Sequence, residues 1–247
     1  GAAVGAGAGV GAGASPQAAA SPPRGDLPLM AARIFVLAGV NGAGKSSIGG
    51  AALQARKVPY FNPDLAARTL LDTNPALAQE AANAQAWEMG RAGLERALAE
   101  GLNFAFETTL GARTLPDMLL AGARRGAQVH VWYAGLDSPE KHIERVKERV
   151  IAGGHDIPED KVRARYVSSR ANLVRLLPHL ASLRMYDNSI DGDPKAGVRP
   201  QPVLVLHMEG GQIVSHIALD QVPQWAKPVV AAAFDAAKKK ATKGRPH

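Results

Sequence analysis

The residues from Gly39 to Ser46 carry the clearest chemical signal in the chain. They read Gly-Val-Asn-Gly-Ala-Gly-Lys-Ser, which fits the pattern G-x-x-x-x-G-K-[ST] without a mismatch. Glycines at these positions let backbone N–H groups turn toward phosphate oxygens, and a helix that begins here adds a favourable dipole. We therefore expect this loop to bind ATP. The residues expected at the nucleotide are Gly39, Asn41, Gly42, Ala43, Gly44, Lys45, Ser46 and Ser47.

Two members of this loop have distinct expected roles. Lys45 would neutralise the β- and γ-phosphates, and the hydroxyl of Ser46 would bind the Mg²⁺ that accompanies the nucleotide. No cluster of His, Asp and Glu in the sequence has the spacing of a separate metal site, so this Mg²⁺ is the metal we expect. The alternative is a glycine-rich turn without a ligand. The apolar run Ile34–Ala38 before the loop and the helical pattern after it favour nucleotide binding.

The rest of the sequence narrows the class of nucleotide-binding protein. A guanine-reading Asn-Lys-x-Asp is absent from the sequence, and so is an apolar strand ending in the Asp-Glu pair of motor and helicase ATPases. Small-molecule kinases often lack that pair and close an arginine-rich segment over the phosphates instead. A kinase is therefore the favoured class.

Two carboxylates are candidates for the acceptor side of such a site. Asp64 comes just after a predicted strand at Tyr60–Phe61, and Glu107 directly follows another that ends at Phe106. Ligands in open α/β sheets bind at the carboxyl ends of strands, where a kinase needs a carboxylate near the acceptor hydroxyl. As alternatives, Asp64 would cap a helix over 65–72, and Glu107 would be satisfied by nearby backbone donors. Position alone leaves these alternatives open.

Four blocks of sequence occur in a characteristic order: 38–47, 61–64 (Phe-Asn-Pro-Asp), 106–110 (Phe-Glu-Thr-Thr-Leu) and 153–159 (Gly-Gly-His-Asp-Ile-Pro-Glu). Together they resemble the zeta-toxin family of P-loop kinases, in particular its chromosomal branch of predicted ATPases or kinases. The resemblance covers about residues 33–190. The phosphate loop is shared by many families, whereas the Asn-Pro-Asp and Glu-Thr-Thr blocks are more specific.

The resemblance implies ATP-dependent phosphorylation of a small molecule. Zeta toxins phosphorylate UDP-N-acetylglucosamine at the sugar 3′-hydroxyl, which makes a nucleotide-sugar the expected acceptor and an antitoxin protein a candidate partner. Asp64 stands at the family's base position. Glu107 stands at the acceptor-binding acid with Thr108 and Thr109 beside it, and Arg113 matches a substrate-side basic residue.

Residues 138–177 are expected to form a helical lid of two helices joined at Gly153–Gly154. Converging arginines in a lid can stabilise charge on a transferring phosphoryl group and close the site against water. The alternative is a solvated helix face of Glu–Arg pairs. In the zeta-like pattern one arginine comes from each helix. The favoured arginines are Arg149 and Arg165, with Arg145 and Arg163 as substitutes.

Alternating strand and helix patterns predict the α/β class: a P-loop three-layer sandwich with a mostly parallel sheet and a C-terminal β-hairpin turning at 209–211. Strands are expected at 34–38, 60–61, 103–106, 128–133, 183–186, 203–208 and 212–217. Helices are expected from about 44, and over 74–100, 114–125, 138–152, 158–177 and 222–237. The kinase domain is thus expected to span 31–237.

Both ends of the chain differ in composition from this domain. Residues 1–30 are almost entirely Gly, Ala, Ser and Pro, which predicts a disordered arm rather than a secretion signal. Residues 238–247 are expected to form a flexible basic tail. The formal net charge is +7, but five of these charges lie in that tail, which leaves +2 elsewhere.

Charge and composition therefore argue against several classes of protein. A nucleic-acid partner is not indicated by the nearly neutral body, although an ATPase that binds nucleic acid through its tail remains an alternative, as does a nucleotide-regulated binding protein. There is no Cys for a disulfide or a thiolate site, and no apolar run long enough to span a membrane. We expect a cytoplasmic enzyme.

Overall fold

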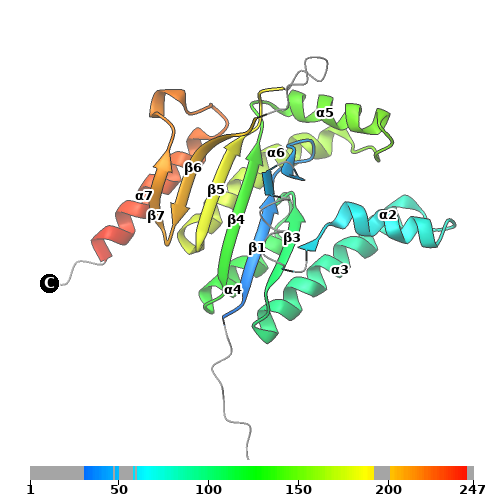
Figure 1. Cartoon of the computed structure of the whole chain (residues 1–247), viewed down its shortest axis with the longest axis horizontal. Coiled ribbons are helices and arrows are strands. Elements are labelled where there is room, and N and C mark those ends of the chain that lie inside the picture. The colour runs from blue at the N-terminus through cyan, green and yellow to red at the C-terminus, as the bar shows by residue number, and fades with distance from the viewer. Residues whose placement is uncertain (1–30, 47, 50–57, 59, 192–200, 244–247) are drawn as a thin grey trace, which may run out of the picture.

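One seven-stranded sheet organises the chain (Figure 1). The computed structural model describes residues 31–46, 48–49, 58, 60–191 and 201–243. The strands lie in the order β2-β3-β1-β4-β5-β6-β7. They are β1 (Arg33–Ala38), β2 (Tyr60–Phe61), β3 (Phe104–Thr108), β4 (Gln128–Gly135), β5 (Ser182–Asp187), β6 (Val203–Glu209) and β7 (Gln212–His216).

The first five strands of the sheet order are parallel, and β6 and β7 join antiparallel as a hairpin. At the end of β1, Ala38 pairs with Thr108 on one side and with Tyr133 on the other. The carboxyl ends of β1, β3 and β4 therefore meet at one edge of the sheet, where the phosphate loop begins. The prediction of a mostly parallel sheet with a C-terminal hairpin is confirmed.

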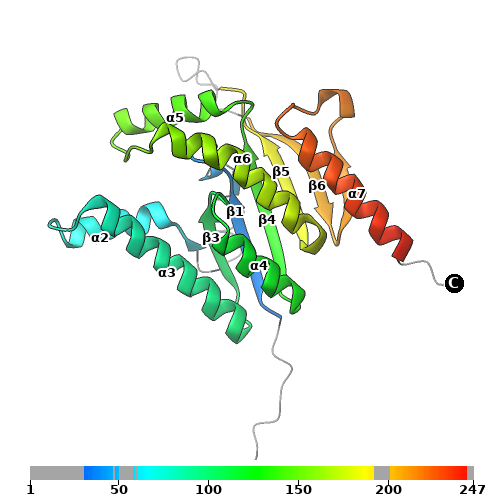
Figure 2. The ribbon, with the colours of Figure 1, turned by 180° about the vertical axis from the view of Figure 1, so that it is seen from behind.

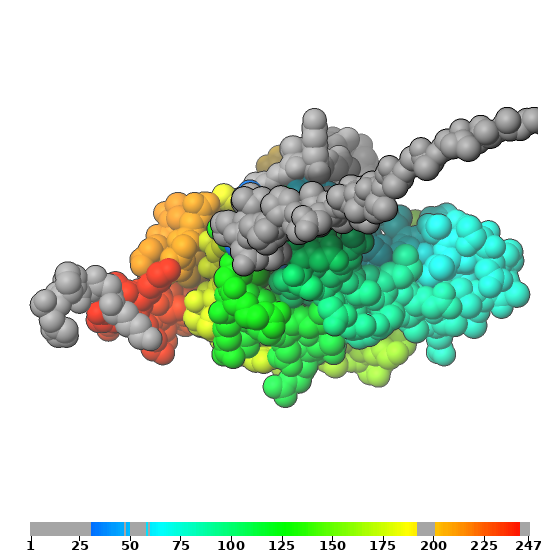
Figure 3. Space-filling model, turned by 90° about the horizontal axis from the view of Figure 1, so that it is seen from below, coloured from blue at the N-terminus to red at the C-terminus, as the bar shows by residue number. Residues whose placement is uncertain are grey.

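Helices pack against both faces of the sheet. The described helices are α2 (Pro63–Thr73), α3 (Gln79–Glu100), α4 (Thr114–Arg124), α5 (Pro139–Ile151), α6 (Glu159–Leu176) and α7 (Lys227–Lys243), with short 3₁₀ turns at Leu177–His179 and Leu219–Gln221. Figure 2 shows α3, α4, α6 and α7 on one face of the sheet. In Figure 3, α2 with α3 forms one end of the molecule, and the hairpin with α7 forms the other.

The alternation of side chains along β1 explains how the sheet is buried on both faces. Ile34 and Val36 join the main core beneath α4, α6 and α7. Phe35 and Leu37 point the other way and pack against Ile48, in the helix that begins at Lys45. The expected three-layer α/β architecture is confirmed.

The expected helix start at Asn74–Pro75 is wrong. A proline restricts the residue before it to extended conformations, and Asn74 accordingly ends α2, its N–H donating to the carbonyl of Leu70. The long helix α3 begins only at Gln79. Helix α2 in turn begins earlier than the segment 65–72 that we considered, because Pro63 occupies its first turn.

The C-terminal boundary also differs from the prediction. Helix α7 begins at Lys227 rather than near Val222, because Pro223 and a short turn precede it. It then continues through the basic residues to Lys243, so residues 238–243 are helical instead of a flexible tail. The Nζ atom of Lys240 donates to the carbonyl of Gly210 in the hairpin turn.

Predictions for residues 1–30, Ser47 and 244–247 lie outside the described residues. Among the helices that the structure describes, none is both long and apolar enough to cross a membrane.

Candidate functional site

The phosphate loop leaves β1 in a conformation that requires glycine. Gly42 and Gly44 have φ values of +80° and +75°, in the left-handed region that L side chains rarely adopt. A Cβ atom on Gly42 would lie 2.6 Å from the carbonyl oxygen of His142. A helix begins at Lys45, and the exposed Ser46 side chain follows in its first turn.

Two buried polar side chains hold this loop from behind. Nδ1 of His142, from α5, donates to the carbonyl of Asn41 at 2.8 Å, and Nδ2 of Asn188 donates to that of Ala43 at 2.9 Å. Burial lowers the pKa of His142 to about 4, so the imidazole is neutral at physiological pH. The loop therefore has a fixed backbone before any ligand contact is considered.

Lys45 and Glu107 form a nearly buried ion pair beside the loop. Their Nζ and Oε1 atoms are 3.3 Å apart, and the side chains are only 9% and 12% exposed. The other carboxylate oxygen of Glu107 accepts from the hydroxyl of Tyr60 at 2.7 Å and from Nδ2 of Asn62 at 3.1 Å. Burial, with the Glu107 charge beside it, raises the pKa of Tyr60 far above its ordinary value. Glu107 lies within β3 rather than after it.

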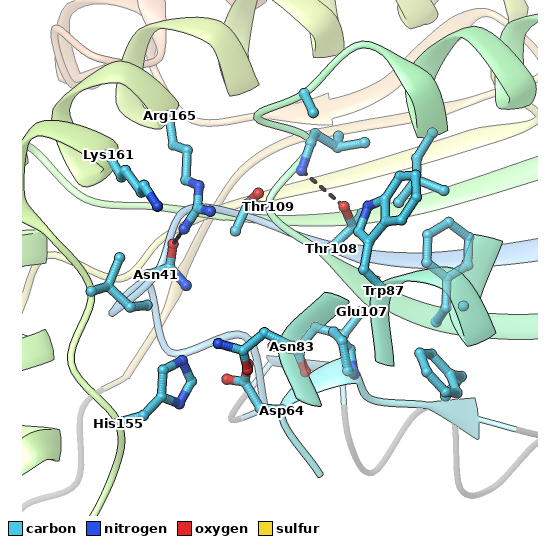
Figure 4. Close-up of a pocket in the computed structure, with 18 of the residues that line it drawn as sticks. Asn41, Asp64, Asn83, Trp87, Glu107, Thr108, Thr109, His155, Lys161 and Arg165 are labelled. Atoms are coloured by element: carbon cyan, nitrogen blue, oxygen red, sulfur yellow. Dashed lines mark hydrogen bonds between the residues drawn. The ribbon is translucent and has the colours of Figure 1, made fainter. Parts of the chain in front are cut away.

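A cavity of about 310 Å³ opens between this ion pair and the lid. Its polar wall contains Asn41, Asp64, Asn83, Glu107, Thr108, Thr109, His155, Asp156, Lys161 and Arg165, and its apolar wall includes Phe61, Trp87, Phe106, Leu110 and Ile157. Figure 4 shows Lys161 and Arg165 pointing into it from α6, with Asp64 and Asn83 on the opposite side. The phosphate loop and both predicted carboxylates thus border one space.

The two carboxylates have different surroundings. Asp64 is 49% exposed, and Nη1 of Arg149 approaches its Oδ2 atom at 3.4 Å, near the limit of a hydrogen bond. Glu107 is engaged by three donors. The alternative that Asp64 caps α2 is wrong, because the side chain of Asn62 accepts from the N–H groups of Asp64 and Leu65. Of the two predicted carboxylates, Asp64 is therefore the more exposed.

The favoured lid arginines both reach the site. Arg165 donates from Nη1 to Oδ1 of Asn41 in the phosphate loop at 2.8 Å, and burial lowers its pKa. Arg149 reaches Asp64 as described. Of the substitutes, Arg163 pairs with Glu140 in a separate hollow lined by α5 and α6.

Arg145 lies nearer the loop than Arg163, but its guanidinium is already held. Nη2 donates to the carbonyl of Asn188 at 2.9 Å and to the carboxylate of Asp191 at 2.6 Å. Helix α5 therefore presents Arg149 to the cavity side and uses Arg145 to tie itself to the segment after β5.

The segment 108–112, which begins at the last residue of β3, forms one wall of the cavity. The side-chain oxygens of Thr108 and Thr109 accept from the N–H groups of Leu110 and Gly111, at 3.1 and 3.3 Å. Leu110 has a φ of +52°, a left-handed conformation that costs a residue with a side chain about 1–3 kcal/mol. Such strain persists only where the surroundings hold it.

The structure therefore brings together most of the predicted site and adds residues that the sequence reasoning missed. Arg113 is exposed just before α4 and is not among the described residues that line the cavity. The missed residues are Asn83, Trp87 and Lys161. A tryptophan in an Ala-rich helix, and a lysine four residues before Arg165, were the available signals. Within the described ranges, no group of three or more His, Asp or Glu could hold a metal by itself.

A mostly parallel sheet, a glycine-rich phosphate loop and two helices over the same edge define a P-loop NTPase/kinase fold, so the fold class predicted from the sequence is confirmed.

Of the comparisons with known proteins, the solved structures agree with this fold. No family model matches the sequence. An uncharacterized protein of Haemophilus influenzae is 29% identical over 143 residues, which are 58% of this chain and 99% of that protein. A crystal structure of AvrRxo1-ORF1:-ORF2 with ATP matches with a TM-score of 0.54 and 16% identity, over 83% of this chain and 64% of that chain. A second, with sulphate ions, has the same TM-score and identity and covers 85% and 76%. The chain thus spans less than two thirds of the first of these structures.

Proposed function

We propose that this protein is an ATP-dependent kinase that transfers the γ-phosphate of ATP to a hydroxyl of a small-molecule acceptor. The observation that carries the proposal is that Asn41, in the phosphate loop, and Asp64, in α2, line the same cavity. A hydroxyl held by Asp64 would therefore lie next to the phosphates. The AvrRxo1-ORF1:-ORF2 structure with ATP is consistent with ATP as the donor.

The residues of the loop fit the phosphates of ATP. Backbone N–H groups around Gly42 and Gly44, together with the start of the helix at Lys45, would face the phosphate oxygens. Lys45 would supply the positive charge, and the Ser46 hydroxyl would hold Mg²⁺. The bound Mg²⁺ would neutralise charge on the phosphates.

Asp64 would act as the base or orienting carboxylate. It would take the proton of the acceptor hydroxyl as the hydroxyl oxygen forms its bond to the γ-phosphorus. The bond from the γ-phosphorus to the bridging oxygen would break, and ADP would leave. Arg165, which lines the cavity, and Arg149, which contacts Asp64, would balance the charge on the transferring group.

The acceptor is defined more loosely than the donor. About 310 Å³ is at the small end of ligand sites, which span roughly 300–1,000 Å³, so the cavity suits a small molecule or one part of a larger one. From the family resemblance we propose a nucleotide-sugar, with UDP-N-acetylglucosamine as the first compound to test. Glu107, Thr108 and Thr109 would contact it.

The resemblance also supports a role as the toxin of a toxin–antitoxin pair. Under this proposal the enzyme works in the cytoplasm, where ATP is available, and an antitoxin protein binds it. One of the similar crystal structures is described as a complex of AvrRxo1-ORF1 with ORF2, which is consistent with a protein partner.

Incubation with γ-labelled ATP and a panel of UDP-sugars, nucleosides and dinucleotides tests the activity. We expect a new phosphorylated compound that Lys45→Ala abolishes. Labelled inorganic phosphate alone, with turnover stimulated by DNA or RNA and lost at high salt, would favour a nucleic-acid-associated ATPase instead.

A further inference from the structure

The segment 108–112, here called the acceptor loop, is held by side chains of α6. Oγ of Ser168 lies 2.8 Å from the carbonyl oxygen of Gly111 and 3.0 Å from that of Ala164, so its one hydrogen is shared between the two acceptors. Nδ2 of Asn172 donates to the carbonyls of Leu110 and Ala112, at 2.7 and 3.0 Å. One amide group therefore bridges the two carbonyls on either side of Gly111.

One end of this bridge lies at Leu110, the strained residue of the loop. Leu110 is 1% exposed, and its φ is +52°. The core packed around its side chain and the hydrogen bond from Asn172 to its carbonyl together hold this conformation. Asn172 is itself buried, and its Oδ1 atom accepts from Arg175 at 3.0 Å. Both ends of the Asn172 amide are thus occupied, which fixes its orientation.

The shape of the loop decides where two hydroxyls point. Because the oxygens of Thr108 and Thr109 accept from the N–H groups of Leu110 and Gly111, each hydroxyl keeps its own hydrogen for another partner. Both threonines line the cavity. If the loop relaxed at Leu110, these two amide contacts would be lost and the hydroxyls would turn freely.

The same helix also reaches the phosphate loop. Ser168 lies three residues after Arg165, and Asn172 lies seven residues after it. This spacing places all three side chains on one face of α6. Arg165 contacts Asn41, and its Cγ atom would lie 2.6 Å from a Cβ on Gly111. One face of α6 therefore contacts both the phosphate loop and the acceptor loop, and so fixes their relative position.

We propose that Asn172, assisted by Ser168, is a positioning residue that holds the acceptor loop in its left-handed shape and so aims Thr108 and Thr109 at the acceptor. The part of this inference that concerns the acceptor rests on the proposed kinase function. The part that concerns the loop does not.

Hydrogen–deuterium exchange of the full chain tests the loop without any substrate. Asn172→Asp keeps the size of the side chain and its contact with Arg175, but it removes both N–H donors. We expect exchange in peptides covering 107–113 to accelerate about tenfold, as loss of buried hydrogen bonds implies, while peptides covering 39–46 are unchanged. Ser168→Ala, which removes one bond, should give a smaller acceleration at the same place.

Ser169→Ala is the matched control. Ser169 lies on the same helix and is buried, but its hydroxyl bonds to Tyr133 of β4 rather than to the acceptor loop. We expect this variant to leave exchange at 107–113 unchanged. Equal acceleration in Asn172→Asp and Ser169→Ala, or none in the first, would overturn the inference.

Steady-state kinetics with UDP-N-acetylglucosamine as the probe tests the consequence for transfer. Asn172→Asp should raise the KM for the sugar nucleotide about tenfold and leave the KM for ATP unchanged. The positioning role is contradicted if exchange at 107–113 accelerates but the KM for the acceptor is unchanged. It is also contradicted if the KM values for the acceptor and for ATP rise equally. If the parent enzyme does not phosphorylate this probe, the proposed acceptor fails, and the exchange result still decides whether Asn172 holds the loop.

Discussion

The Nζ atom of Lys45 lies 3.3 Å from the Oε1 atom of Glu107, and both side chains are almost completely buried. This pair joins the phosphate loop to β3, and Glu107 extends the connection to β2 through Tyr60 and to the cap of α2 through Asn62. The residue that we expected to bind the acceptor therefore also holds the lysine of the phosphate loop in place.

Glu107→Gln should destabilise the protein and weaken ATP binding. The amide that replaces one oxygen would point a donor at Lys45 or at Tyr60, so at least one buried group loses its partner, at a cost of about 1–3 kcal/mol. Urea denaturation and ATP titration measure the two effects. Glu95→Gln, which breaks an exposed pair with Arg91, is the control and should change neither. Parental stability in Glu107→Gln would contradict this account of the pair.

Arg165→Ala should lower the rate of phosphate transfer about 100-fold, because it removes a cation aimed at the phosphate loop. Arg163→Ala should leave the rate unchanged, since that side chain pairs with Glu140 in a hollow separate from the cavity. Single-turnover rates with labelled ATP compare the two. Equal effects of the two substitutions would show that α6 contributes only general positive charge.

Acid should destabilise the protein through His142. Its folded pKa of about 4 lies below the ordinary 6.5, so the unfolded chain binds the extra proton between these values. Stability therefore falls as the pH drops from 6.5 to 4, by about 3 kcal/mol from this group. His142→Asn retains a donor for the carbonyl of Asn41 without titrating, and denaturation at pH 7 and pH 4.5 should show a shallower loss. An identical loss in both proteins contradicts the assignment.

Trp87→Ala should raise the KM for the acceptor about tenfold and leave the KM for ATP unchanged, because the indole forms part of the cavity wall. Met89→Ala is a matched control on the same helix. Met89 is 52% exposed against 41% for Trp87, but it is not among the described residues lining the cavity. A rise in both variants would indicate a change in α3 rather than a lost contact.

Much of this architecture could be predicted from local patterns. The buried run of β1, the glycine spacing of the loop and the Glu209-Gly210-Gly211 turn each depend on neighbouring residues, so the sequence reports them directly. Helix boundaries were harder. The Asn74–Pro75 pair favours a helix start in the sequence pattern, whereas the restriction that Pro75 places on Asn74 ends the preceding helix, and the next helix starts at Gln79.

The site was predictable only in part, for a physical reason. Asp64 lies just after β2 and Glu107 near the end of β3, in a recognisable pattern, but contacts between distant segments leave no local signal. The ion pair of Lys45 with Glu107 joins residues 62 positions apart, as the numbering shows, and Asn172 reaches its loop from α6. Arg113 illustrates the converse, since its position beside the Glu-Thr-Thr block did not bring it into the cavity.

The central claim is that Asp64 accepts the proton of the acceptor hydroxyl. Asp64→Asn retains the size of the side chain but cannot take a proton, and Asp72→Asn, exposed on the same helix, is the control. The most direct measurement is the single-turnover rate of γ-phosphate transfer to the acceptor found by labelling, alongside the Kd for ATP. The account predicts a rate about 10²–10⁴-fold lower in Asp64→Asn, with ATP binding and the control unchanged. Transfer at the parental rate in Asp64→Asn would contradict it.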